Sequence, residues 1–91
     1  MTTYEIEYKK SAAKEIAKLD QSVKKRIIEK IERLAKDPFP PKAKWLQNHP
    51  GKRRINLGDY RIIYQVYEDK LVIEIVKVGH RSSVYKEYDR K

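Results

Sequence analysis

The chain has 91 residues, with 22 lysines and arginines against 13 aspartates and glutamates, and a formal net charge of +9. It contains no cysteine, which excludes disulfides and thiolate metal sites, and its length predicts a single domain over residues 1–91. No apolar run approaches the roughly 20 residues of a membrane-spanning helix, and no signal-peptide pattern opens the sequence. We therefore expect a cytoplasmic protein with no membrane contact, whose positive field favours a polyanionic partner.

The first part of the sequence predicts a strand followed by two helices. Residues 3–8 alternate between apolar and polar types, which is typical of a strand. A short helix is expected over residues 12–19, and a longer one from about residue 21 to Lys36, where apolar residues recur at helical spacing. Asp37-Pro38 ends the second helix, because the residue before a proline avoids the helical region. The buried stripe of the short helix is predicted to be Ala12, Ala13, Ile16 and Ala17.

Residues 37–51 form a long connection that holds all four prolines, which makes it semi-rigid. Trp45 and Leu46 are predicted to anchor this connection to the core. A nucleobase-stacking role for Trp45 is the alternative. His49 is expected to be a turn residue, because no second histidine or acid stands at metal-ligand spacing from it, and no metal site is predicted.

The segment 53–67 predicts a β-hairpin with Gly58-Asp59 at its turn. Side chains alternate across a strand, so Ile55 and Leu57 point to one face and Arg54 and Asn56 to the other. A third antiparallel strand is expected at residues 71–78. It is apolar on nearly both faces, which suits a central strand or one whose second face a partner covers.

This order of elements predicts an α+β fold: a strand, two helices, a three-stranded meander and a short C-terminal helix. Two N-terminal helices are expected to cover one face of a curved, mainly antiparallel sheet, and the other face stays partly open. We expect Arg54, Asn56 and Arg61 on the open face and Arg81 at its rim. A wider set of cations lies in this part of the sequence, where Asp59 is the only acid. The set is Lys42, Lys44, Lys52, Arg53, Arg54 and Arg61.

Two motifs resemble those of the RelE/ParE superfamily, the toxins of bacterial and archaeal toxin–antitoxin modules. They are Gly51-x-x-Arg54-Ile55-x-x-Gly58-Asp59-Tyr60-Arg61-Ile62-Ile63-Tyr64 and Val78-Gly79-His80-Arg81-x-x-Val84-Tyr85. The resemblance covers nearly the whole chain, and it implies a curved sheet backed by two helices and an antitoxin that wraps around the toxin. In the RelE branch it implies ribosome-dependent cleavage of mRNA in the A site. In the ParE branch it implies DNA gyrase as the target.

The resemblance also assigns site residues. Arg61 matches the arginine of the hairpin, Arg81 the arginine after the last strand, and Tyr85 the tyrosine of the C-terminal segment. The RelE branch often carries two basic residues, two positions apart, on the incoming strand; here these positions hold Arg54 and Asn56, so a neutral amide replaces a cation. The predicted catalytic residues are thus Arg54, Arg61, Arg81 and Tyr85.

RNA cleavage through its own 2′-OH requires proton removal, stabilisation of the phosphorane and protonation of the departing 5′-oxygen. Arginine cannot be the base, because its pKa lies above about 12, so the arginines are expected to clamp phosphate oxygens. Tyr85 and His80 are the acid–base candidates, although strand alternation points His80 away from Arg81 and leaves a structural role open. No cofactor is expected. The predicted RNA contacts are Lys44, Lys52, Arg53 and Asn56.

The predicted function is therefore that of a RelE-like mRNA endonuclease, with a small acidic or amphipathic antitoxin and mRNA in the ribosomal A site as partners. Two alternatives remain open at this point. A ParE-like protein would inhibit gyrase without breaking a bond itself. A degenerate, inactive toxin is the other alternative, and Asn56 in place of a cation suggests it.

Overall fold

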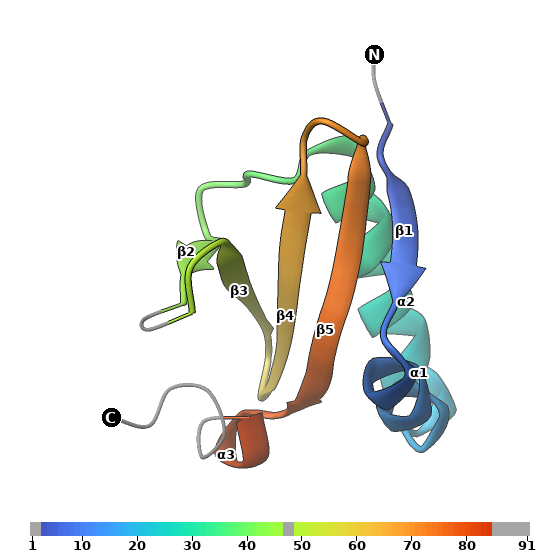
Figure 1. Cartoon of the computed structure of the whole chain (residues 1–91). Helices are drawn as coiled ribbons and strands as arrows, with labels where there is room; N and C mark the ends of the chain where they lie inside the picture. The colour runs from blue at the N-terminus through green and yellow to red at the C-terminus, as the bar shows by residue number, and fades with distance from the viewer. Residues whose placement is uncertain (1–2, 47–48, 85–91) are drawn as a thin grey trace.

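The computed structural model describes residues 3–46 and 49–84, which form one mixed sheet with helices against it (Figure 1). The predicted α+β order is confirmed: helices α1 (Lys10–Ala17) and α2 (Gln21–Lys36) follow the first strand, and α3 (Arg81–Val84) follows the last. Within these residues, no helix has the length and apolar character that crossing a bilayer requires. The strands are β1 (Glu5–Tyr8), β2 (Lys44–Trp45), β3 (Lys52–Leu57), β4 (Tyr60–Tyr67) and β5 (Val72–His80).

The sheet has the order β1-β5-β4-β3-β2. Strands β3, β4 and β5 form the predicted antiparallel meander, while β1 runs parallel to β5 and β2 pairs with β3 at the opposite edge. The turn between β3 and β4 falls at residues 58–59 as predicted, and Gly58 has a φ of +59°, a conformation that favours glycine. Strand β5 is interior to the sheet and buried on both faces, which accounts for its apolar sequence.

The main core lies between the helices and one face of the sheet. On the sheet side it contains Ile55 of β3, Ile62 and Tyr64 of β4, and Ile73 and Ile75 of β5. Helix α2 contributes its apolar stripe along its whole length, as its periodicity predicted, and buries Ile27, Ile31, Leu34 and Ala35.

Helix α1 buries a narrower stripe than the sequence predicted. Ala12 and Ile16 are buried, but Ala13 and Ala17 are exposed. The reason is that this short helix lies near an edge of the sheet and packs chiefly on β5, so only one row of its side chains meets another element.

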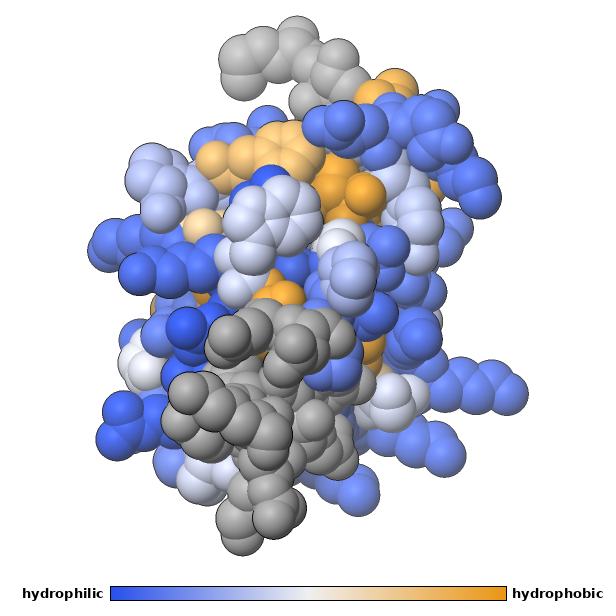
Figure 2. Space-filling view, turned by 60° about the vertical axis from the view of Figure 1, so that its left-hand side comes forward, coloured by the Kyte–Doolittle hydropathy of each residue, from blue (hydrophilic) through white to orange (hydrophobic). Residues whose placement is uncertain are grey.

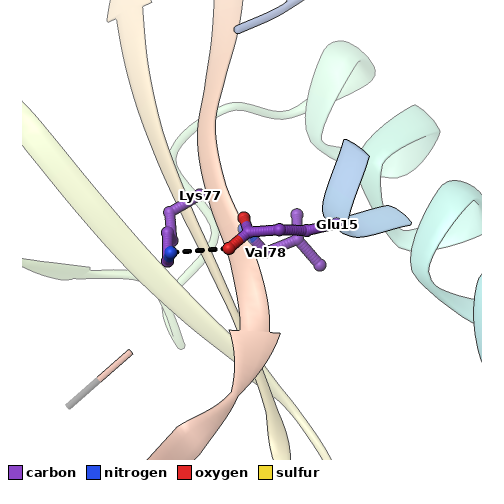
Figure 3. A network of polar contacts seen from close by, with 3 residues as sticks. All are labelled: Glu15, Lys77 and Val78. Atoms are coloured by element: carbon purple, nitrogen blue, oxygen red, sulfur yellow. Dashed lines mark hydrogen bonds and ion pairs between the residues drawn. The ribbon is translucent and has the colours of Figure 1, made fainter. Parts of the chain in front are cut away.

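A carboxylate of α1 completes the edge of β5. Strand β1 pairs with β5 only as far as Ile75, so the following residues of β5 lack a neighbouring strand there. The Oε1 atom of Glu15 accepts a hydrogen bond from the backbone N–H of Val78 at 3.2 Å, and Oε2 forms an ion pair with Lys77 (Figure 3). Glu15 therefore satisfies an edge donor and fixes α1 against the sheet.

The proline-rich connection is fixed at two points. The buried hydroxyl of Tyr64 donates a hydrogen bond of 2.8 Å to the carbonyl of Pro38, and burial raises the pKa of Tyr64 to about 12. Leu46 is buried and anchors the connection as predicted. The same prediction is wrong for Trp45, which is 62% exposed. Trp45 lies on edge strand β2, far from the strands that the helices cover, so neither helix buries it (Figure 1).

Candidate functional site

The open face of the sheet carries a hollow of about 260 Å³, which we call the basic hollow. Strands β2, β3 and β4 and the residues just before β2 supply its lining. Four of the five described lining residues are cations and none of the five is an acid, so the hollow suits an anion. These residues are Lys42, Lys44, Arg54, Asn56 and Arg61.

Strand register explains why these side chains meet. Lys44 is the Cα partner of Arg54, and Asn56 is the partner of Arg61. Directly opposed residues of antiparallel strands point to the same face. That face is the one away from the helices, because Ile63, the other partner of Arg54, belongs to a separate small cluster rather than to the main core.

The guanidinium of Arg61 is set into this face. Its Nε and Nη1 atoms are buried, although the residue as a whole is partly exposed. Partial burial lowers the local dielectric, so a hydrogen bond from such a group to a phosphate oxygen is stronger than the same bond in water. Arg61 is thereby a positioned cation rather than a freely solvated one.

The structure brings together four residues that the sequence singled out, namely Lys44, Arg54, Asn56 and Arg61, and it adds Lys42. The sequence analysis named Lys42 in the wider set of cations but did not include it among the predicted site residues. Lys42 lies in the turn before β2, where the backbone N–H of Ala43 donates to the carbonyl of Pro40 at 3.0 Å, so this turn sets its position.

Two predicted RNA contacts lie outside the basic hollow. Lys52 is on the open face, but its partner is Gln65, further along β4 from the hollow. Arg53 is on the opposite face, because its partner is the core residue Tyr64. The prediction for these residues treated consecutive positions of one strand as a single basic surface, whereas the strand sends them to two faces.

The predicted residues at the end of β5 lie apart from the basic hollow. Arg81 is exposed, and its backbone N–H donates to the carbonyl of Asp59 at 2.7 Å, which joins the end of β5 to the β3–β4 turn. Arg81 itself does not line the hollow. Tyr85 lies outside the described residues.

His80 occupies the helix-side face. Its strand partner is Tyr60, and the two rings meet edge to face with centroids 5.8 Å apart. Its Nδ1 lies 2.9 Å from the Oγ of Ser82 and also accepts from the Ser82 backbone N–H. These contacts suit the structural role that the sequence left open for His80.

A second hollow, of about 470 Å³, lies on the helix-side face of the sheet, beyond the part that α2 covers. We call it the aromatic hollow. The guanidinium Cζ of Arg53 lies 3.9 Å from the ring centroid of Trp45 and 4.6 Å from that of Phe39. The lining also includes Tyr67, Glu68 and Asp69 at the β4–β5 turn. The sequence hinted at this hollow only through the alternative of base stacking by Trp45.

Residues 3–46 and 49–84 contain no group of three or more histidines, cysteines or acids that would hold an ion. The basic hollow offers an anion the forked donors of its arginines and the single-point ammonium groups of its lysines.

Comparison with known proteins finds a matching family model and relatives of similar sequence and fold. The model of the ParE toxin of the type II toxin–antitoxin system parDE matches residues 6–85. The mRNA interferase toxin RelE of Escherichia coli K12 is 32% identical over 88 residues, which cover 92% of each chain. The crystal structure of isolated E. coli RelE gives a TM-score of 0.76 at 32% identity and covers 92% of this chain and 93% of that one. The RelE–RelB complex of Pyrococcus horikoshii OT3 gives a TM-score of 0.75 at 30% identity, over 89% of this chain and 97% of its counterpart.

Proposed function

We propose that this chain, which belongs to the RelE/ParE superfamily of type II toxin–antitoxin toxins and to its RelE-like branch, is an endoribonuclease that cuts mRNA on the ribosome. The observation that carries the proposal is the basic hollow, in which three strands turn cations toward one space. The mRNA interferase named among its relatives gives the substrate class. A gyrase inhibitor would have no need of such a cluster of cations.

The arginines of the basic hollow would bind the scissile phosphate. Arg54 and Arg61 lie on neighbouring strands of the same face and both line the hollow. A guanidinium offers forked N–H donors that match two phosphate oxygens, and it keeps its charge at every accessible pH. These two groups would therefore stabilise the negative charge that grows on the phosphorane in the transition state.

Proton transfer would fall to a lysine. Among the described residues that line the basic hollow, arginine keeps its proton and asparagine does not titrate, so Lys42 and Lys44 are the groups of this set able to exchange one. We place Lys44 in the role of base, because it is the direct strand partner of Arg54. This assignment differs from the sequence expectation, which named Tyr85 and His80.

The proposed step balances without a cofactor. The neutral amine of Lys44 takes the proton of the 2′-OH, and the 2′-oxygen forms a bond to phosphorus. The bond between phosphorus and the 5′-oxygen breaks, and the leaving 5′-oxygen takes a proton from the ammonium of Lys42 or from water. The products are an RNA with a 2′,3′-cyclic phosphate and an RNA with a free 5′-OH.

We also propose a protein antitoxin as the partner of this chain. Relatives of similar fold are known in complexes with an antitoxin, among them the RelBE complex of E. coli and the RelE–RelB complex of P. horikoshii. The basic hollow and the net charge of +9 favour an acidic antitoxin segment. Such a segment in the hollow would exclude mRNA by occupying the same cations.

The test is to induce the protein in cells and map the 5′ ends of mRNA. We expect new ends within translated reading frames for the wild type and for Arg33→Ala, an exposed arginine on α2. Arg54→Ala and Arg61→Ala should lose these ends. Intact mRNA with a DNA-damage response would support gyrase inhibition instead, and growth without arrest would support a degenerate toxin.

A further inference from the structure

The aromatic hollow has no part in the cleavage chemistry, since it faces the other side of the sheet from the basic hollow. We propose that it binds an unpaired guanine base of an RNA. The proposal rests on the proposed function in one respect, because it takes RNA as the class of target. It is carried by three features of the described residues: an exposed tryptophan, a cation packed on its ring, and two carboxylates on the same hollow.

The first feature is the state of Trp45. A tryptophan is the largest apolar side chain, yet this one is 62% exposed while Leu46 beside it is buried. Arg53 contacts the ring at 3.9 Å, a cation–π interaction that holds the indole in place without covering it fully. An indole fixed in this way offers a ready face to an unstacked base, which is how proteins commonly hold single-stranded RNA.

The second feature is that the platform is positioned by the fold. Phe39 is 40% exposed, and Arg53 contacts its ring as well as that of Trp45. Pro38, the residue before Phe39, is buried, and its carbonyl accepts a hydrogen bond from the hydroxyl of the core residue Tyr64. The two rings are thus tied through one guanidinium and one core hydrogen bond, so a base would meet a surface that needs little ordering.

The third feature selects the base. Glu68 and Asp69 line the aromatic hollow and are both exposed. Carboxylates accept hydrogen bonds and repel phosphate, so a heterocycle with N–H donors suits this hollow better than the RNA backbone does. Guanine is the RNA base with two adjacent donor positions on its pairing edge, N1–H and the N2 amino group, which one carboxylate can accept together.

The backbone of the same RNA would lie toward the cations outside this hollow. Lys44 precedes Trp45 on the two-residue strand β2 and points to the basic hollow, so one edge strand connects the two sites. Figure 2 brings the β2 side forward: hydrophilic surface dominates, and the apolar colour gathers mainly in the upper half, at the end where β4 turns into β5. A competing occupant is a basic segment of a protein partner, and the experiment separates the two.

The experiment uses the fluorescence of Trp45, which is the only tryptophan of the chain and lines this hollow. The probes are two five-nucleotide RNAs with 2′-O-methyl groups, which cannot be cut: an all-uridine strand and the same strand with guanine at its centre. They carry equal numbers of phosphates, so the basic hollow contributes equally to both. We expect the guanine strand to quench Trp45 at a concentration at least about fivefold lower, as base stacking and edge recognition require.

The variants assign the recognition to its parts. Glu68→Gln combined with Asp69→Asn should bring the two strands to equal affinity while stacking persists. Glu29→Gln, an exposed acid on α2, serves as the matched control and should keep the guanine preference. Phe39→Ala should weaken both strands, because it removes a ring that Arg53 contacts.

Each remaining outcome overturns the proposal. These are equal quenching by both strands in the wild type, a guanine preference that survives loss of both carboxylates, or quenching by an antitoxin but by no RNA. A parallel mRNA cleavage assay separates this proposal from the proposed function. Cleavage without guanine-dependent quenching would remove the base site alone, and guanine-dependent quenching without cleavage would remove the nuclease assignment alone.

Discussion

The basic hollow and the aromatic hollow lie on opposite faces of the same three strands, and they share the two-residue strand β2. Lys44 lines the first and Trp45 the second. The basic hollow has four cations and no acid, whereas the aromatic hollow has one cation and two acids. The first therefore suits a phosphate and the second a flat heterocycle with N–H donors.

The two hollows differ most in how they use an arginine. Arg54 and Arg53 are consecutive, but strand alternation turns the first toward open cationic surface and the second toward two aromatic rings. A guanidinium that rests on aromatic rings holds those rings in place and is less available to an outside phosphate. Net charge counts both arginines alike, so it overstates the cations that an RNA backbone would meet.

The largest effect should separate these two arginines. Arg54→Ala and Arg61→Ala are each expected to lower cleavage of ribosome-bound mRNA by about 10²–10³-fold, because a charge-stabilising donor is lost from the transition state. Arg53→Ala should lower it by less than about tenfold, since its role would be confined to binding. The measurement is the single-turnover rate with purified ribosomes, and equal losses in all three variants would erase the distinction between the faces.

Lys44 gives the next test of the basic hollow. Lys44→Ala should reduce the single-turnover rate by about 10²-fold, the usual contribution of a positioned base. Lys44→Arg should fail to restore it, because arginine retains the charge but cannot accept the proton. Restored activity in Lys44→Arg would mean that charge alone matters.

A second-site change sharpens that test. Asn56 lines the same hollow, so Asn56→Lys in the Lys44→Ala background should recover part of the rate. Lys30→Ala on α2 is the control for loss of a cation elsewhere. No recovery by Asn56→Lys would place the proton acceptor outside the described part of the hollow.

Much of this arrangement could be predicted from the sequence. The features that were not predicted have a common cause. Apolar periodicity and the Gly58-Asp59 turn predicted α2 and the β3–β4–β5 meander, since those signals are local. Strand β2 was missed because two residues are too few to show a period. Its placement decides that Lys42 and Lys44 meet Arg54, which is a matter of register between strands distant in sequence.

Trp45 and Arg53 show the same limit. Composition favours burial of a tryptophan, but an edge strand beyond the reach of both helices leaves Trp45 exposed. Alternation along β3 is enough to predict that Arg53 and Arg54 point to opposite faces of the sheet. The ring contacts of Arg53, however, depend on where the proline-rich connection places Phe39. The motif named Arg81 and His80, and strand alternation alone was enough to point His80 away from Arg81.

A change in stability should follow from Tyr64, a core residue whose hydroxyl also holds Pro38 next to the aromatic hollow. Its pKa is raised to about 12 by burial, with Arg53 opposing and Asp37 reinforcing the shift. The folded state therefore keeps this proton to higher pH than the unfolded state, whose tyrosine pKa is about 10. The contribution of Tyr64 to the free energy of unfolding should be fully present below pH 10 and be lost, by about 2–3 kcal/mol, as the pH rises from 10 through 12.

Tyr64→Phe isolates this contribution. The variant should lose about 1 kcal/mol at pH 8, where the hydrogen bond to Pro38 is missing, and should show a shallower decline of stability at alkaline pH. Urea unfolding followed by circular dichroism measures both, and the titration of lysines cancels in the comparison with wild type. Quenching of Trp45 by RNA should weaken while mRNA cleavage is retained; the reverse pattern would contradict the separation of the two hollows.

The smallest effect is in the salt dependence of RNA affinity. Each cation that contacts a phosphate releases counterions, so Lys42→Ala should lower the slope of log affinity against log salt by about 1. Trp45→Ala should weaken binding of the uncleavable RNA by a similar factor at every salt concentration and leave that slope unchanged. Arg53→Ala is the decisive case: an unchanged slope means that its charge is directed to the rings of Phe39 and Trp45, and a slope lowered by about 1 means that it reaches a phosphate. Only the first result keeps the two faces chemically distinct.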